Sequence, residues 1–250
     1  GGRDLAKAEA VAREIGGATG IRVDLDRADL GLSGGEAFSA VAVFVKDDRL
    51  SSMRYAQHHK IPYISISSGT FEIGPEVAQY VHAPDRAPIL LASHWLAGAA
   101  IFPVLGFAKD FQRIDAVRIG VLLDEQDTGG PAALTDYNRI TGAAPAALTV
   151  KDGKMHWAGS DDGKARYVSV DGVELDAQAY SPFDIMALAA RTDAKAIRLD
   201  LAYSVSASRR RGEAFSTEIT IEIEGQGADG KQRLDRHEIV HPQGQAPLTA

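Results

Sequence analysis

The chain has 250 residues, of which 45% are hydrophobic and 24% charged, and its formal net charge is −7. These proportions are those of a soluble globular protein, so they exclude collagen, a coiled coil and wholesale disorder. The absence of cysteine excludes disulfides, thiolate metal sites and a cysteine nucleophile. The acidic balance argues against a nucleic-acid partner, and no apolar run reaches the ~20 residues of a membrane helix. We therefore expect a cytoplasmic protein of one or two domains that binds neither nucleic acid nor membrane.

The first part of the chain alternates helix and strand. Asp4 is a good N-cap for a helix that ends at Gly16-Gly17. Further strands are expected at 21–25, 40–45, 62–67 and 88–92, and further helices at 49–59 and 75–82. Because the loops between them are short, the strands must be joined by right-handed crossovers into a parallel sheet. We predict an incomplete, Rossmann-like α/β domain over residues 1–111.

The pattern changes near Phe111. Longer, alternating and β-branched segments predict strands at 114–123, 147–158, 165–171, 196–205, 215–224 and 233–241, with helices at 132–140 and 182–191. Residues 217–224 alternate strictly, which predicts a strand with one face in water. Residues 225–230 match G-x-G-x-x-G, but they lie between two strands, which is typical of a hairpin turn. We predict an antiparallel-sheet α+β domain over residues 112–250, for substrate binding or dimerisation.

An α/β domain followed by an antiparallel sheet is the plan of two-domain dehydrogenases. Arg3 lies where a second Rossmann strand would end, and a guanidinium there can hold the 2′-phosphate of NADP. A solvated arginine before a helix is the alternative. Asp24, at the end of the next strand, could bind the adenine amino group or equally stabilise a turn.

Four short motifs occur in order along the chain. They are GRDLAKAEA at 2–10, VDLD at 23–26, HKIPYIS at 59–65 and LASHWLAG at 91–98. Together they resemble the NADP-binding domain of saccharopine-dehydrogenase-like oxidoreductases. The resemblance implies an NADP cofactor, held in part by Gly2 and Arg3, and hydride transfer at an amino-acid-like small molecule. The chain departs from the family pattern at Ser65, where the family has Asp, and at Ala97, where it has Pro.

The family's first strand, its glycine-rich turn and its first helix have no counterpart in these residues, which begin without Met. We therefore expect an excerpt of a longer protein. Because that turn holds the pyrophosphate, the excerpt alone is expected to bind NADP poorly.

The remaining candidate residues follow strand ends or stand in the second domain. Val45, Lys46 and Ser67 are expected to line the cofactor groove, although Lys46 could also be a solvated loop lysine. His94 could relay a proton where nicotinamide and substrate meet, or could simply begin a helix. The candidates for substrate contact are Trp95, Tyr137 and Arg210. The alternatives are a Trp in the domain interface, a packing Tyr, and an Arg in a solvated turn or in contact with an acidic partner.

No HExxH, paired-His or EF-hand spacing is present, so we expect no metal site. The leading hypothesis is an NADP-dependent oxidoreductase, with a homodimer as a further expectation. A non-catalytic sensor or assembly module derived from the same fold is the second hypothesis, favoured by the departures at Ser65 and Ala97. A different two-domain dehydrogenase, for example one acting on sugars, is the third.

Overall fold

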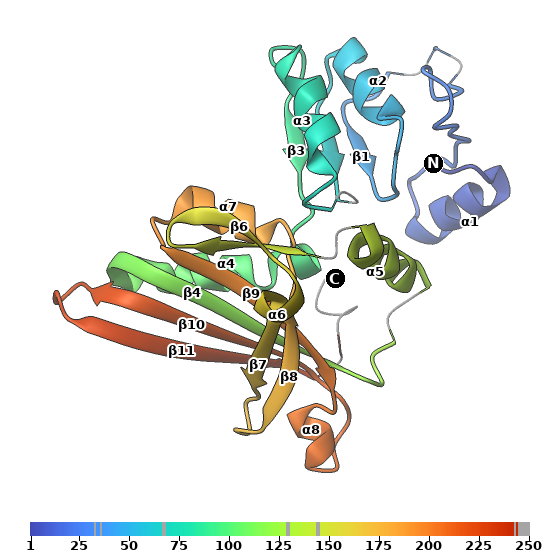
Figure 1. The fold of residues 1–250 in the computed structure, drawn as a ribbon. Helices are drawn as coiled ribbons and strands as arrows, with labels where there is room; N and C mark the ends of the chain where they lie inside the picture. Colours follow the sequence, from blue (N-terminus) through green and yellow to red (C-terminus); the bar gives the residue numbers. More distant parts are fainter. Residues whose placement is uncertain are drawn as a thin grey trace. The chain divides into compact units, whose positions relative to one another are not determined.

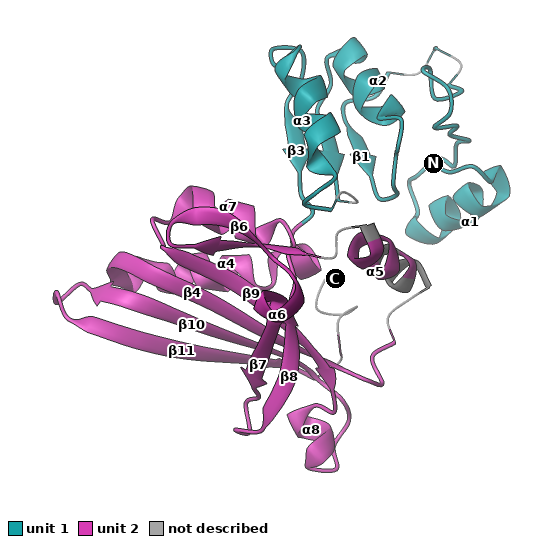
Figure 2. Cartoon of the chain, in the orientation of Figure 1, with its two compact units in different colours: residues 1–93 teal, residues 94–250 magenta. Residues whose placement is uncertain are grey.

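The computed structural model describes residues 1–32, 34–35, 37–66, 69–128, 131–143, 146–242 and 244. The chain forms two compact units, residues 1–93 and residues 94–250 (Figure 2). The sequence prediction put the boundary after Phe111 instead. Residues 94–110 belong to the second unit because Ile101 and Val104, which they contain, are buried in its core.

The helices of the first unit form where the sequence predicts them. Helix α1 spans Leu5–Ile15, and the Asp4 carboxylate accepts a hydrogen bond from Lys7 N at 3.2 Å. Gly16, with φ of 73°, ends the helix in a conformation that glycine adopts without strain. Helices α2 (Ser51–His59) and α3 (Ile73–Val81) follow. The predicted N-cap and glycine stop of α1 are therefore confirmed.

Three short strands form the parallel sheet of the first unit (Figure 1). They are β1 (Val41–Val43), β2 (Tyr63–Ser65) and β3 (Ile89–Leu91), in the order β1-β2-β3. Met53 and Ala56 of α2 are fully buried against Val43 and Tyr63, so the apolar stripe of this helix covers the sheet. The predicted parallel, Rossmann-like α/β arrangement is confirmed.

The predicted strand at 21–25 is wrong in extent. Only Arg22 pairs, through an isolated parallel bridge to Gly2, with a hydrogen bond from Val23 N to Gly2 O at 2.9 Å. Asp24 then turns the chain: its carboxylate accepts from Asp26 N at 3.0 Å. Local hydrogen bonding by this aspartate therefore outweighs the apolar run that suggested a longer strand.

The second unit is built on an eight-stranded sheet with the order β11-β10-β4-β9-β5-β6, and β8 also pairs with β9 and with β7. The strands are β4 (Phe111–Asp124), β5 (Ala147–Lys151), β6 (Lys154–Ala158), β7 (Lys164–Val168), β8 (Glu174–Ala179), β9 (Ala196–Ser204), β10 (Thr217–Gly227) and β11 (Gln232–His241). Most pairs are antiparallel, but β4 and β9 are parallel, so the sheet is mixed. The α+β class is confirmed, while β8 was not predicted and the strand predicted at 147–158 is a hairpin, β5–β6.

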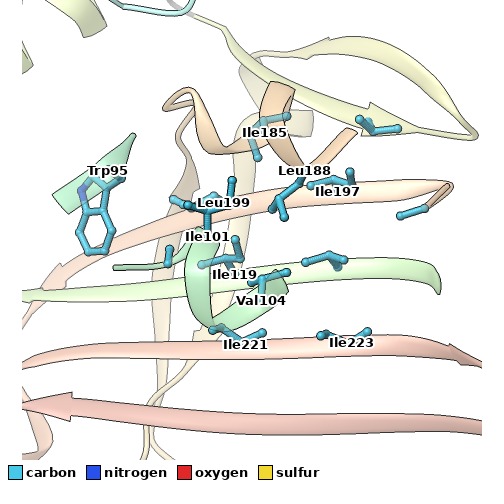
Figure 3. Packing of buried hydrophobic residues seen from close by; sticks show 14 of the residues in the cluster. Trp95, Ile101, Val104, Ile119, Ile185, Leu188, Ile197, Leu199, Ile221 and Ile223 are labelled. Carbon is cyan, nitrogen blue, oxygen red and sulfur yellow. The ribbon is translucent and has the colours of Figure 1, made fainter. Parts of the chain in front are cut away.

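Helices α4 and α7 contribute to the main core (Figure 3). The helical segments of this unit are η1 (Trp95–Gly98), α4 (Ile101–Phe107), η2 (Ala108–Asp110), α5 (Pro131–Ala143), α6 (Ser160–Gly163), α7 (Asp184–Arg191) and α8 (Ala207–Arg210). Ile101 and Val104 of α4 pack with Ile185 and Leu188 of α7 and with the central strands. No helix in the described part of the chain is both long and apolar enough to cross a bilayer.

The prediction that β10 has one face in water is wrong for its first half. Glu218 and Thr220 are 0% and 4% exposed. The Glu218 carboxylate accepts hydrogen bonds from Ser169 Oγ and Ala207 N, each at 2.6 Å, so the β7–β8 hairpin and α8 supply its partners. The buried carboxylate is tolerated because these donors replace water. The glycine-rich segment does form the β10–β11 hairpin, with Gly227 N donating to Lys231 O at 2.9 Å, as predicted.

Candidate functional site

The predicted cofactor residues of the first unit lie at strand ends. Gly2 and Arg22 pair in parallel, and Arg3 and Asp24 stand one and two residues beyond this pair. Arg3 is exposed and, among the described residues, makes no ion pair. Its guanidinium is therefore available to an anion, whereas Asp24 already serves a turn. Gly2 has open space where a Cβ would stand.

The residues after β1 and β2 are in different situations. Val45, two residues beyond the end of β1, is 58% exposed. Lys46 Nζ lies 3.3 Å from Glu72 Oε1, and the Lys46 side chain is 24% exposed. Lys46 is thus neither a free phosphate ligand nor a solvated lysine, since it forms a partly buried ion pair. Ser67 lies outside the described residues.

His94 and Trp95 open the second unit, and Trp95 meets the first residue of α7. Trp95 N donates to Asp184 Oδ2 at 2.7 Å. The Asp184 side chain is fully buried. Burial raises the pKa of the Asp184 carboxyl, and the Trp95 N–H and the charge of His94 oppose that shift. The Trp95 ring is 9% exposed and belongs to the core, where Figure 3 shows it beside the sheet.

The backbone directly after Trp95 is strained. Leu96 and Ala97 have φ of 43° and 53°, and Gly98 has φ of 95°. Left-handed backbone costs a residue with a Cβ roughly 1 kcal/mol or more, and such strain concentrates at functional sites. A Cβ on Gly98 would also clash with the Phe102 ring. The turn therefore requires glycine at 98 and fixes the direction in which the chain leaves His94.

The segment 180–184 contacts two of the predicted site residues, each through a different aromatic side chain. The His94 ring lies 6.3 Å from the Phe183 ring, centroid to centroid, at 70°. The Tyr137 ring, from α5, lies 6.4 Å from the Tyr180 ring. Tyr137 is 44% exposed, so its hydroxyl-bearing side chain is accessible to a small molecule. We call residues 180–184 the aromatic segment, and His94 and Tyr137 each contact it.

Arg210 is not part of the aromatic segment, because its guanidinium is occupied elsewhere. Both Nε and Nη2 donate to the Asp171 carboxylate at 2.7 Å, and Nη2 also donates to Ser169 Oγ at 2.6 Å. A third nitrogen, Nη1, donates to the Val205 carbonyl. These hydrogen bonds from Arg210 connect α8 to the β7–β8 hairpin. Because its guanidinium is occupied by them, we assign no substrate contact to Arg210.

Sequence reasoning missed Asp184 and Tyr180. The residues Ser181-Pro182-Phe183-Asp184 look like an ordinary helix start, since an acidic residue in a first turn is favourable anyway. The partner of Asp184 lies 89 residues earlier, which no local pattern reveals. Within the described residues, no group of three or more His, Asp or Glu side chains could hold a metal ion.

Comparison with known proteins gives matches in structure only. No protein-family model and no curated sequence matches the chain. The fold is similar to saccharopine dehydrogenase (L-Glu forming) from Saccharomyces cerevisiae, with a TM-score of 0.58 and 12% identity over 99% of this chain and 81% of that one. Weaker similarities are to amine dehydrogenase from Mycobacterium smegmatis (TM-score 0.45, 12% identity, 99% and 80% covered) and to an oxidoreductase from Sinorhizobium meliloti (0.41, 12%, 99% and 71%). The resemblance to saccharopine dehydrogenase is thus confirmed for the fold.

Proposed function

We propose that this chain is part of an NADP-dependent oxidoreductase that acts on a small amino-acid-like molecule. The observation that carries the proposal is that residues 180–184 contact His94 through Phe183, the Trp95 backbone through Asp184 and the accessible Tyr137 through Tyr180. Along the chain, only Ala92 and Ser93 separate His94 from β3, the last strand of the parallel sheet. In such folds ligands bind beyond the carboxyl ends of the strands. The fold of saccharopine dehydrogenase supports oxidoreductase chemistry in general.

The residues of the first unit suit an adenosine carrying a 2′-phosphate. Arg3 offers an exposed guanidinium without an ion pair among the described residues, and a guanidinium can donate two parallel hydrogen bonds to phosphate. One carboxylate oxygen of Asp24 accepts the hydrogen bond that stabilises the turn. The other oxygen would accept a hydrogen bond from the adenine amino group. When bound, the nicotinamide of NADP supplies a hydride acceptor or donor.

The residues of the second unit would hold the substrate and move its proton. His94 is our candidate for exchanging a proton with the nitrogen or oxygen on the reacting carbon. Tyr137 and Tyr180 would bind the substrate through one phenol hydroxyl and one ring face. Asp184 does not touch substrate in this proposal. It is a positioning residue whose carboxyl accepts a hydrogen bond from the backbone N–H of Trp95, directly after His94.

A cofactor titration tests the proposal. NADPH and NADH are titrated into the full-length protein, and binding is followed by nicotinamide fluorescence. We expect saturable NADPH binding that weakens about tenfold or more in Arg3→Gln, because a charge-assisted bidentate contact is lost, while NADH binding stays unchanged. Arg13→Gln is the control, since Arg13 is an exposed arginine near the other end of α1. Absence of NADPH binding at high micromolar concentration would overturn the proposal.

The same protein distinguishes the non-catalytic alternative. A panel of oxo acids is tested, each together with an amine. If the protein binds NADPH but oxidises it with none of them, a sensor or assembly module is favoured. Turnover with a sugar but not with amino-acid-like molecules would favour the different two-domain dehydrogenase. Turnover with an amino-acid-like molecule supports the proposal as stated.

A further inference from the structure

The first unit contains a pocket of about 550 Å³ whose lining includes none of the residues proposed for the cofactor. A volume of this size is typical of small-molecule sites. Its walls come from α2, from α3, and from residues 28, 29, 32 and 34 in the loop that precedes β1. His58 and His59, at the end of α2, precede β2, and Arg86 precedes β3. These residues therefore lie toward the amino ends of the strands, whereas Arg3 and Lys46 follow strand ends.

The side chains around this pocket are mainly cationic or hydrogen-bond donors. Arg54 and His58 are four residues apart on α2, so they share one face of the helix. Arg86 lines the same pocket from another element. Within the described part of the chain, neither Arg54 nor Arg86 makes an ion pair. Two uncompensated guanidinium groups converging on one cavity favour an anion there.

The one carboxylate of the pocket is already neutralised. Arg27 donates to both oxygens of Asp29, at 2.8 and 2.7 Å. These hydrogen bonds hold the pKa of Asp29 well below its usual value, so this carboxylate stays charged and paired. The carbonyl end of α2 is itself unfavourable for an anion. The attraction must therefore come from the side chains, above all from Arg54 and Arg86.

Gln57 provides an independent indication of a ligand. It lines the pocket, and its side chain is 2% exposed. Its Oε1 accepts a hydrogen bond from Gln79 Nε2 at 2.9 Å, while its own amide nitrogen donates to no atom of the described residues. A buried donor without an acceptor costs about 1–3 kcal/mol, so an acceptor at this position would be stabilising.

The remaining walls suit an organic group attached to the anion. The Tyr55 and His59 rings lie 4.2 Å apart, centroid to centroid, at 37°, and both face the pocket together with Ala28 and Leu32. A bare inorganic ion would leave these surfaces unused. An anion that carries a small planar or apolar group would cover them.

We propose that this pocket binds a small phosphate monoester, at a site separate from the proposed NADP site. Arg54 and Arg86 hold the phosphate, because a dianion matches two guanidinium charges and offers acceptors to several donors. The imidazole N–H groups of His58 and His59 add donors at the rim, and the ring of Tyr55 contacts the organic part. The site requires neither hydride transfer nor the second unit.

Calorimetric titration with phenyl phosphate, inorganic phosphate and benzoate tests this site. We expect phenyl phosphate to bind saturably and more tightly than inorganic phosphate, and benzoate to bind more weakly than either. Arg54→Gln and Arg86→Gln should each raise the Kd for phenyl phosphate about tenfold or more, since each removes a charge-assisted hydrogen-bond donor. Both arginines are exposed, so the fold should survive, and two variants on different elements guard against one that does not fold.

Two controls separate this site from other anion sites. Arg13→Gln removes one exposed charge of the same unit and should leave the Kd unchanged. Arg3→Gln should also leave it unchanged, although it weakens NADPH binding, so the two proposals can fail independently. Phenyl phosphate should shift the NMR ring signals of His58 and His59. Tighter binding of benzoate, loss of binding in Arg3→Gln, or equal affinity in all four variants would overturn the site.

Discussion

Trp95 and Asp184 are 89 residues apart in the sequence, and the backbone N–H of Trp95 donates to Asp184 Oδ2 at 2.7 Å. This bond joins the start of η1 to the start of α7. His94 directly precedes Trp95 in the chain, and Phe183 directly precedes Asp184. The rings of His94 and Phe183 are also in contact. The start of α7 thereby fixes the backbone that carries the proposed proton carrier. Asp184 is costly to bury as a charge, which suggests that its position serves more than stability.

Replacing Asp184 with Asn tests the cost of this buried carboxyl. Because the folded-state pKa is raised, Asp184 favours folding when protonated, and that contribution is lost as pH rises through the raised pKa. Asp184→Asn has no such loss and can still accept from Trp95 N. We expect the variant to gain stability relative to the parent between pH 4 and pH 7, as measured by urea unfolding. A stability difference that does not change with pH would contradict this expectation. Asp161→Asn, which replaces an exposed carboxylate, is the control and should show no such pH-dependent gain.

The strained turn after Trp95 predicts unequal responses to substitution at Gly98 and at Gly106. Gly98→Ala places a Cβ against Phe102 at φ of 95°, so we expect a loss of about 2 kcal/mol or more in unfolding free energy. Gly106→Ala, inside α4, meets no atom within 4 Å and should be neutral or stabilising by about 0.5–1 kcal/mol. Thermal unfolding of both variants measures the contrast. Equal effects would mean that the turn is not strained.

Much of the fold could be predicted because its signals are local. The cap at Asp4, the stop at Gly16 and the hairpin at Gly227 depend on residues a few positions apart. The strand predicted from Ile21 failed where two local signals competed, since Asp24 turns the chain. The burial of Glu218 could not be predicted, because the β7–β8 hairpin that covers it lies about 50 residues away.

The candidate site could be predicted only in part for the same reason. His94 and Tyr137 were selected by residue type and position, but nothing in the sequence shows that the aromatic segment joins them. Arg210 was a candidate substrate ligand because a guanidinium can bind the carboxylate of an amino-acid-like molecule. Its actual partners, Asp171 and Ser169, lie about 40 residues earlier and are revealed only by the fold.

Removing the Arg210 charge should destabilise the second unit in a pH-dependent way. Hydrogen bonds from Arg210 lower the pKa of Asp171 to about 2, so their contribution is present above the normal aspartate pKa and is lost as pH falls toward 2. We expect Arg210→Gln to cost about 1–3 kcal/mol at pH 7 and much less near pH 2. Arg211→Gln is the control, because its pair with Glu213 is exposed to solvent and should contribute much less to stability. Similar losses in both variants at pH 7 would refute the special role of Arg210.

Replacing His94 with Gln tests the proton carrier directly. Gln keeps polarity and approximate size but cannot exchange a proton, so kcat for an amino-acid-like substrate should fall about 10²-fold or more. KM and the affinity for NADPH should change little, because the proposed binding contacts are made by Arg3, Tyr137 and Tyr180. His237→Gln is the matched control, since His237 stacks on Phe107 at 3.6 Å in the same unit and has no proposed role in chemistry. If His94→Gln retains kcat while its thermal stability falls, His94 acts by packing against Phe183, and the proton carrier must be sought elsewhere in the aromatic segment.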